Sequence, residues 1–366
     1  MRIGFFVPSC TPENSHGRYV IELGKRLAAQ HDVVIHAGAF WPPLRSLVQC
    51  RALPIVNRPA AVRLATLWMA AGIVAKSRLD VVHVQGADAP IGDVVTAHCC
   101  NAAMRRAEHH DVTWVRRLNY ALGVAAERHC LTRRGTRRVI AVSDRVKGEI
   151  ERYYGVDGAT VTVIPPGVDA QAFHPRNRAT LRQATRERLG LAPDAFVVAF
   201  VGRDDRRKGL GTLVDAVHVA GPGVQALAVG PRARTHLRTT SGDQVTFVRA
   251  TPDIVPYYAA ADCFALPTRY DTFSLATLEA MASGLPTIVS RAAGVSDYLT
   301  DGVDALILED AGDVTTLAAH LRRLASDQAL RARVARGGRE TAERFSWERT
   351  VARTVDVYRQ ALDSRA

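Results

Sequence analysis

Two acidic side chains, Asp271 and Glu279, have seven residues between them in the stretch DTFSLATLEAMASGLPTIVS, which begins at Asp271. A helix that starts early in this stretch places them about two turns apart, so one acid can face a phosphate and the other a sugar hydroxyl. The N–H groups of Phe273, Ser274 and Leu275 would then lie at the helix N-terminus, where backbone donors bind phosphate. The spacing alone fits an ordinary helix with a solvated Glu equally well.

The elements around this stretch predict where such a site would lie. The apolar run 263–267 precedes it as a strand, and residues 275–283 contain no Gly or Pro and are typical of a helix. Gly284 and Pro286 end that helix, and residues 287–289 begin the next buried strand. This order is a βαβ unit of an open parallel sheet, which binds ligands at the carboxyl ends of its strands.

A second strand end carries basic side chains. The apolar run 196–201 is followed by GRDDRRKG, in which Arg203 and Lys208 precede a predicted helix over 210–219. Arg offers a bidentate fork and Lys a compact charge, so both can hold a diphosphate above the sheet; a basic solvated turn is the alternative. Asp204 and Asp205 lie among four basic residues and make a poor Mg²⁺ site, so we predict no essential metal.

The N-terminal half has two further strand ends with polar groups. A strand over 2–7 leads into the loop 8–17, whose last residue, Gly17, directly precedes a predicted helix over 18–30. Backbone and small side chains can approach an anion there, although the loop is not a GxGxxG fingerprint. The predicted strand 93–97 ends at His98, and a single His after a strand is more often structural.

Length and composition fit a globular protein of two domains. The 366 residues are 47% hydrophobic and 23% charged, and the longest apolar helical run, 64–75, is shorter than a membrane span. The first ten residues read as a strand rather than a signal peptide. The six cysteines show no CxxC spacing, which predicts reduced thiols and a cytoplasmic protein.

The net charge of +12 is unevenly distributed. Residues 1–180 carry 24 Lys and Arg against 14 Asp and Glu, which favours either an anionic partner or solubility. Within 105–138 an apolar stripe at helical spacing is accompanied by many arginines. We interpret the stripe as core packing and the Arg cluster as an acceptor surface or a peripheral contact with an anionic membrane.

Four stretches occur in an order that resembles one enzyme family. They are VVTAHCCN, IAVSDRVKGEI with VIPPGVDAQAF, GRDDRRKG, and the acidic–seven–Glu stretch from Asp271. Together they resemble the retaining glycosyltransferases of family 4, also called glycosyl transferases group 1, which use sugar nucleotides. The resemblance covers nearly the whole chain.

The resemblance implies an α/β protein with the GT-B fold, in which two Rossmann-like domains with parallel sheets face each other across a cleft. Residues 1–169 would bind the acceptor and residues 170–347 the sugar nucleotide, while a helix over about 348–366 packs back onto the first domain. The turn Pro165-Pro166-Gly167 is a physical reason to place the boundary near residue 170.

The resemblance also implies residue roles. His98 would orient the donor sugar and stabilise developing positive charge, and Gly17 would approach the donor phosphates. Arg203, Lys208 and the N–H groups of 273–275 would hold the diphosphate. Glu279 would accept hydrogen bonds from the ribose, and Asp271 from sugar hydroxyls.

The implied reaction moves a sugar from a UDP-, GDP- or ADP-sugar to a hydroxyl of a sugar, a glycolipid or a small molecule. The product would belong to cell-surface polysaccharide, glycolipid or natural-product glycoside biosynthesis. No further cofactor and no nucleic acid is implied. Rival interpretations are an epimerase of the same fold, a catalytically silent homologue, and a basic nucleic-acid-binding protein, which the few aromatic residues disfavour.

The chain departs from the family pattern at the first acid. The family usually has Glu where this chain has Asp271, and a side chain shorter by one methylene moves the carboxylate by about 1.5 Å. Thr272 and Ser274 also replace glycines that are common there, which restricts the backbone beside the diphosphate. These changes leave the class intact and leave the sugar open.

Overall fold

The computed structural model describes residues 1–56, 60–87, 89–107, 114–203, 206–230 and 242–364. The chain forms two compact units, the first made of Met1–Pro166 with Trp347–Ala366 and the second of Gly167–Ser346. The sequence analysis placed these boundaries at 169/170 and 347/348. Among the described residues, no helix is both long enough and apolar enough to cross a bilayer.

The first unit contains a seven-stranded sheet in which every neighbouring pair is parallel. The strand order is β3-β2-β1-β4-β5-β6-β7. Strand cores of Val, Ile and Phe are buried on both faces, as expected for a parallel sheet covered by helices. The strands are β1 (Arg2–Phe6), β2 (Asp32–Ala37), β3 (Gln49–Ala52), β4 (Val81–Gln85), β5 (Val94–Ala97), β6 (Arg138–Ala141) and β7 (Val161–Val163).

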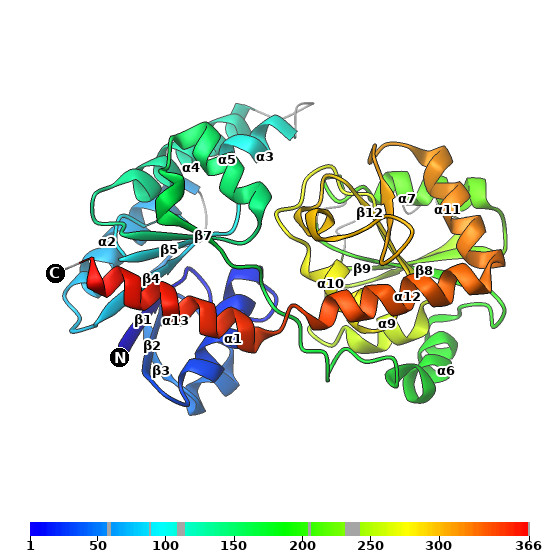
Figure 1. Cartoon of the computed structure of the whole chain (residues 1–366), viewed down its shortest axis with the longest axis horizontal. Helices are drawn as coiled ribbons and strands as arrows, with labels where there is room; N and C mark the ends of the chain where they lie inside the picture. Colours follow the sequence, from blue (N-terminus) through cyan, green and yellow to red (C-terminus); the bar gives the residue numbers. More distant parts are fainter. Residues whose placement is uncertain (57–59, 88, 108–113, 204–205, 231–241, 365–366) are drawn as a thin grey trace. The chain divides into compact units, whose positions relative to one another are not determined.

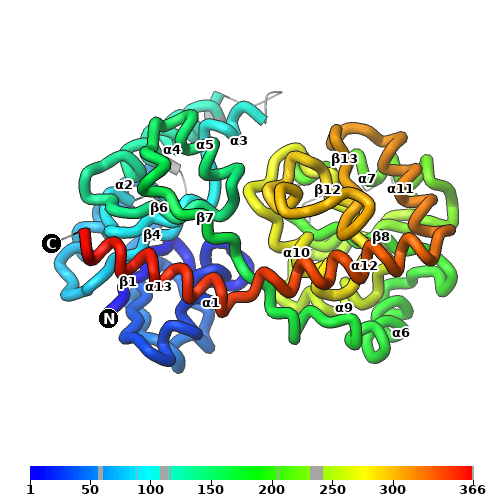
Figure 2. Tube along the Cα trace, in the orientation of Figure 1, coloured from blue at the N-terminus to red at the C-terminus, as the bar shows by residue number. Residues whose placement is uncertain are grey.

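The helices of this unit include the last helix of the chain. Helix α13 (Trp347–Asp363) runs along α1 (Ser15–Leu27), as the red and blue helices of Figures 1 and 2 show. The buried rings of Tyr19 and Trp347 meet edge to face at 5.6 Å between centroids. The other helices are α2 (Ala60–Ala75), α3 (Asn101–Ala107), α4 (Trp114–Thr132) and α5 (Asp144–Tyr154), with short 3-10 turns at Pro42–Ser46 and Gly158–Thr160.

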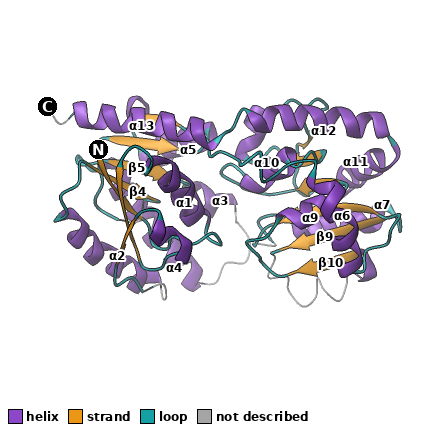
Figure 3. Ribbon diagram, turned by 90° about the horizontal axis from the view of Figure 1, so that it is seen from below, coloured by secondary structure: helices purple, strands orange, loops and turns teal. Residues whose placement is uncertain are grey.

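The second unit contains a six-stranded sheet, again parallel throughout, in the order β10-β9-β8-β11-β12-β13. Strands β9 and β10 run side by side in Figure 3. The strands are β8 (Phe196–Val201), β9 (Val224–Val229), β10 (Val245–Val248), β11 (Cys263–Leu266), β12 (Thr287–Ser290) and β13 (Leu306–Leu308). The helices are α6 (Asn177–Leu189), α7 (Leu210–Ala220), α9 (Val255–Ala260), α10 (Leu275–Ala282), α11 (Val314–Ser326) and α12 (Gln328–Glu343), with 3-10 turns at Gly242–Gln244 and Gly294–Tyr298.

Both sheets reverse their direction of growth once, and this fixes where loops converge. In the first sheet β2 and β3 lie on one side of β1 and β4 to β7 on the other. In the second, β9 and β10 lie on one side of β8 and β11 to β13 on the other. At each reversal, the loops that follow the two neighbouring strands leave the sheet in opposite directions. These strands are β1 and β4 in the first sheet and β8 and β11 in the second. The divergence opens the crevice in which such folds bind ligands.

The predicted elements of the sequence analysis are present, with two differences that have physical causes. Helix α1 begins at Ser15 rather than at residue 18, because the Asn14 side chain accepts a hydrogen bond from His16 N and caps the helix. Helix α6 has no counterpart among the elements predicted from the sequence. Its buried face consists of Thr185 and Arg186 rather than an apolar stripe, so it has little helical periodicity in hydrophobicity.

Salt bridges to a single carboxylate, rather than an apolar face, hold helix α6 against the second unit. Three of its arginines, Arg178, Arg182 and Arg186, bind the Asp262 carboxylate at 2.8, 2.8 and 2.6 Å. Val197 N at the start of β8 also donates to Asp262, at 2.9 Å. Burial raises the pKa of Asp262, but the Val197 N–H and the arginines outweigh it and hold that pKa below its usual value.

This cluster predicts a pH-dependent stability. Asp262→Asn leaves three guanidinium groups without their counter-charge, so we expect the free energy of unfolding at pH 7 to fall by about 3 kcal/mol. Because the folded pKa of Asp262 is depressed, its contribution is present above its unfolded pKa of about 4 and is lost as pH falls through the folded value. Urea unfolding of both proteins should therefore give curves that converge towards pH 3.

Asp194→Asn, at an exposed carboxylate of the same unit, is the matched control and should change stability by less than about 0.5 kcal/mol. A difference between wild type and Asp262→Asn that stays constant from pH 7 to pH 3 would contradict the electrostatic account.

Candidate active site

The loops that follow β8 and β11 are bound to each other at the point where the second sheet reverses its growth. Arg269 N donates to Arg207 O at 2.8 Å, and Thr268 Oγ1 donates to the same carbonyl at 3.0 Å. In return Arg207 Nη1 donates to Tyr270 O at 2.8 Å. These bonds place the basic loop directly beside the loop that carries Asp271.

Gly209 allows the two loops to approach this closely. It has φ +77, and a Cβ built on it would lie 1.8 Å from the carbonyl oxygen of Pro267. Any side chain would therefore be strained in its backbone and would also overlap the β11 loop. The glycine starts α7, so it fixes the loop and the helix that follows it.

Lys208 and Asp271 form an ion pair between these loops, with the ammonium donating to Asp271 Oδ2. Both side chains are largely buried, at 14% and 11% exposure. Burial alone raises the pKa of Asp271, but the charges of Lys208 and Arg207 and the hydrogen bonds from Lys208 and Ser274 lower it below its usual value. The carboxylate is therefore ionised at neutral pH and can only accept hydrogen bonds.

The N-terminus of α10 lies next to this pair. Ser274 is the N-cap residue: its Oγ accepts from Thr277 N at 3.4 Å and lies 2.8 Å from Thr277 Oγ1. Its φ of 90 makes it the one non-glycine residue with positive φ in the described part of the chain. Strain of this kind is retained where the surroundings hold the backbone in place, and it clusters at functional sites. It also explains why glycine suits this position.

The N–H groups of Phe273, Ser274 and Leu275 surround this cap. Within the described residues none of the three donates to a backbone or side-chain acceptor. Free backbone donors at a helix N-terminus beside a lysine favour an anionic ligand. The phosphate contact of these residues stays a prediction.

Glu279 and Arg203 differ in their surroundings. Glu279 is 3% exposed, and its Oε2 accepts from the Tyr258 hydroxyl at 3.1 Å. Arg203 is exposed directly after β8, where it can reach a ligand above the sheet. Asp204 and Asp205, on which the prediction about a metal was based, lie outside the described residues.

In the first unit, His98 follows β5, the strand next to the corresponding reversal between β1 and β4. Its Nε2–H donates to Gln85 Oε1 at 2.8 Å, and its ring stacks on His16 at 4.2 Å between centroids. Burial, with the neighbouring His16 and His83 rings, holds the pKa of His98 well below its usual value. The imidazole is therefore neutral at pH 7.

A chain of buried hydrogen bonds fixes this orientation. Gln85 Nε2 donates to His83 Nε2 at 3.0 Å, and His83 Nδ1 lies 2.7 Å from the Tyr358 hydroxyl of α13. Because His83 Nε2 accepts, its proton is on Nδ1 and is donated to Tyr358. Burial lowers the pKa of His83 to about 3, so this chain stays uncharged. The C-terminal helix thus supports the side chain of His98.

Gly17 lies within the first turn of α1 and is buried, whereas the sequence analysis placed it in the preceding loop. A Cβ there would lie 2.6 Å from the backbone of Ser9 and Thr11, so glycine is required by the close approach of the β1–α1 loop. Its predicted contact with donor phosphates stays a prediction.

Sequence reasoning missed three residues that the structure joins to the site. Arg207 stands in a run of basic residues that gives no sign of which one turns inward. Gln85 ends β4 and could have been found from its strand end, but only the strand order places it beside His98. Tyr258, whose hydroxyl donates to Glu279, lies in a short apolar helix. The composition of that helix is typical of a core segment, so it gives no sign of a polar contact.

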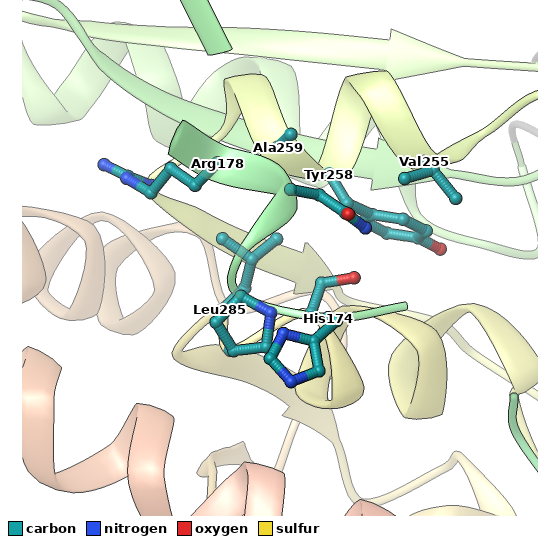
Figure 4. A pocket seen from close by; sticks show the side chains of 10 residues that line it. His174, Arg178, Val255, Tyr258, Ala259 and Leu285 are labelled. Atoms are coloured by element: carbon teal, nitrogen blue, oxygen red, sulfur yellow. The ribbon is translucent and has the colours of Figure 1, made fainter. Parts of the chain in front are cut away.

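A pocket of about 50 Å³ lies elsewhere in the second unit (Figure 4). Tyr258, His174 and Leu285 line it, together with Ser283 and Gly284 at the C-terminal end of α10. It is therefore at the opposite end of α10 from Ser274. Its volume is also far below the roughly 300 Å³ that a small-molecule site needs.

The close contact between Gly209 and Pro267 can be tested by substitution. Gly209→Ala introduces both backbone strain and overlap with Pro267, so we expect the free energy of unfolding to fall by at least about 2 kcal/mol. Gly211→Ala, two residues later in α7 with open space around it, is the matched control and should be neutral or stabilising by about 0.5–1 kcal/mol. Equal effects of the two substitutions in thermal unfolding would contradict the proposed loop contact.

Comparison with known families identifies two successive matches. Residues 16–172 match the family described as Glycosyltransferase Family 4, and residues 195–327 match Glycosyl transferases group 1. Together these matches include the loops that carry His98, Lys208 and Asp271.

Among curated proteins, the chain is similar to D-inositol 3-phosphate glycosyltransferases. The protein of Xylanimonas cellulosilytica is 32% identical over 252 residues, which cover 63% of this chain and 60% of the relative. That of Segniliparus rotundus is 34% identical over 250 residues, which cover 62% of this chain and 55% of the relative. The match therefore spans 60% or less of the length of these relatives.

Solved structures share the whole fold. WaaG, a glycosyltransferase involved in lipopolysaccharide biosynthesis, has a TM-score of 0.84 at 19% identity, covering 97% of this chain and 99% of WaaG. Anabaena Alr3699/HepE, solved in complex with UDP and glucose, has a TM-score of 0.77 at 21% identity, covering 97% and 98%. The chain belongs to glycosyltransferase family 4, the glycosyl transferases group 1, and has the GT-B fold.

Proposed function

We propose that this protein transfers a sugar from a nucleoside diphosphate sugar to an acceptor hydroxyl with retention of anomeric configuration. The observation that carries the proposal is the buried Lys208–Asp271 pair beside the N-terminus of α10. The crevice at the strand ends contains a cation, free backbone N–H groups and an ionised carboxylate. The cation and the N–H groups suit the diphosphate and its leaving oxygen, and the carboxylate suits the sugar hydroxyls.

The basic groups would act on the diphosphate. As the bond between the sugar C1 and the diphosphate oxygen breaks, negative charge develops on that oxygen. Lys208, Arg203 and the N–H groups of 273–275 stabilise this charge, because they are already oriented and the site is partly shielded from water. Lys208 is held by Asp271 before the donor binds, so the ammonium needs little reorganisation.

Asp271 would bind the sugar rather than donate a proton. Its depressed pKa keeps it ionised, so it accepts hydrogen bonds from sugar hydroxyls and cannot serve as a general acid. The Asp side chain is one methylene shorter than Glu and is held by Lys208, so the sugar hydroxyl must come close to the β8–α7 loop. This proximity makes the choice of sugar sensitive to residue 271.

His98 would face the same sugar as a neutral hydrogen-bonding group. A neutral imidazole does not repel the positive charge that develops at C1, whereas an imidazolium would. The acceptor oxygen forms its bond to C1 on the face from which the diphosphate leaves, and the acceptor proton passes to the diphosphate. Glu279 would accept hydrogen bonds from the ribose, and Gly17 would border the phosphates.

The comparisons guide the choice of substrates to test. HepE was solved with UDP-glucose, which makes UDP-glucose the first donor to test. The names of the relatives make a phosphorylated polyol hydroxyl the first acceptor to test, ahead of a sugar or a glycolipid.

The proposal predicts nucleotide-dependent stabilisation. A ligand that binds only the folded protein raises its unfolding free energy by about 2.7 kcal/mol at one hundred times its Kd. We expect UDP-, GDP- or ADP-sugars to raise Tm, and the double variant Lys208→Met/Asp271→Asn to lose most of this shift. The double variant removes both charges, so no uncompensated charge is left buried.

Lys147→Met, a lysine of the first unit paired with Glu151, is the control and should keep the nucleotide shift. If nucleotides at millimolar concentration leave Tm unchanged while nucleic acid raises it, the transferase proposal fails. Conversion of the donor to an epimer without any acceptor would favour the epimerase instead.

A further inference from the structure

Apart from Arg63 and Thr66, helix α2 consists of apolar residues and glycine, and yet it is half exposed. Leu67, Ala70, Ala71 and Val74 are buried against the first unit. The opposite side is exposed and consists of Val62, Ala65, Trp68, Met69, Gly72 and Ile73. Helices that are apolar all round are normally enclosed, so the second face is the unusual one.

The exposed side chains recur every three or four residues and therefore form one continuous stripe. Met69 is 74% and Ile73 53% exposed. Large apolar groups gathered in this way mark an interaction surface, whereas single exposed ones do not. We call this stripe the α2 face.

Helix α4 extends the α2 face. The Trp68 ring lies 5.6 Å from that of His129 on α4, so the two helices are joined at their exposed sides. Trp114, 76% exposed, and Leu118 lie in the first turns of α4. Each of the two helices thus exposes one tryptophan, and tryptophan is enriched where one end of a side chain is apolar and the other meets water.

Within the described residues of α2 and α4, the exposed charged side chains are all basic. Helix α2 contains no acidic residue, and the single acid of α4, Glu127, is buried, where it accepts from Asn101 N at 2.6 Å. Lys76 at the end of α2 and Arg117 and Arg128 on α4 are exposed. An apolar stripe whose exposed charged neighbours in the described part of α2 and α4 are basic is complementary to an anionic bilayer rather than to a second copy of itself, because two such surfaces repel.

The Arg-rich stretch of the sequence analysis is only partly available for such a contact. Arg133 donates to Pro90 O, and Arg137 binds Asp93 and the Ser364 carbonyl, so both serve the first unit internally. The side chain of Arg116 is not described. Trp114 and Leu118 belong to the stripe within 105–138 that was interpreted as core packing, and their exposure corrects that interpretation. The apolar α2 face is the larger part of the surface.

We propose that the α2 face, with Trp114 and Leu118 of α4, rests in the headgroup region of a bilayer that contains anionic phospholipids. The apolar side chains would enter the boundary of headgroups and acyl chains, and the basic side chains would bind phosphates. At 16 residues α2 is shorter than the roughly 20 needed to span a bilayer, which fits a helix lying in the interface plane. This inference does not depend on the proposed transferase activity.

Co-sedimentation of the full chain with vesicles tests the proposal. We expect binding to vesicles of equimolar phosphatidylglycerol and phosphatidylcholine to exceed binding to phosphatidylcholine alone by about tenfold or more, and to weaken with salt. Met69→Glu/Ile73→Glu should reduce the binding to anionic vesicles by at least about tenfold, and Trp fluorescence should no longer shift to the blue.

Val219→Glu/Val303→Glu is the matched control, because both valines are 52% exposed but lie in the second unit. It should bind vesicles as wild type does. Equal binding by wild type and the α2 variant would overturn the proposal. A wild type that light scattering finds dimeric, with an α2 variant that is monomeric, would also overturn it in favour of self-association.

Discussion

The buried ion pair between Lys208 and Asp271 is the interaction on which the candidate site depends. Neither group would be stable alone at this depth, because an uncompensated buried charge costs several kcal/mol. The pair is possible because Gly209 lets the β8 loop touch the β11 loop and because Arg207 bonds the two loops together. The pair keeps an ammonium and an ionised carboxylate side by side at the N-terminus of α10. Neither side chain therefore has to move into position when a ligand binds.

Strand order supplies the rest of the positioning, and both units use it in the same way. Each sheet reverses its growth once, and each reversal collects polar groups from strand ends that are far apart in sequence. In the second unit these groups are charged and bind one another. In the first they are neutral: His98, Gln85 and His83 form a hydrogen-bonded chain that ends on Tyr358 of α13. The groups at the reversal are thus charged in the second unit and neutral in the first.

The sequence predicted most of the fold and named most residues of the candidate site, whose roles stay predictions, but it did not predict their contacts. Continuous apolar runs and the Gly or Pro residues that end them are local signals. The strands that end at Val201 and Leu266, and helix α10, could therefore be predicted. Helix α6 was missed, since salt bridges rather than an apolar stripe hold it. The pairing of Lys208 with Asp271 and the support of His98 by Gln85 depend on strand order, which no local pattern contains. Exposure is equally non-local, and the apolar stripe of α4 was therefore taken for core although Trp114 and Leu118 face solvent.

A structure of the protein with a bound nucleoside diphosphate sugar is the most direct measurement of the central claim. The account predicts that diphosphate oxygens lie within hydrogen-bond distance of Lys208 Nζ and of the N–H groups of Ser274 and Leu275, with Asp271 accepting from a sugar hydroxyl. A nucleotide bound elsewhere in the second unit, with the Lys208–Asp271 pair unchanged and out of reach of the phosphates, would contradict it.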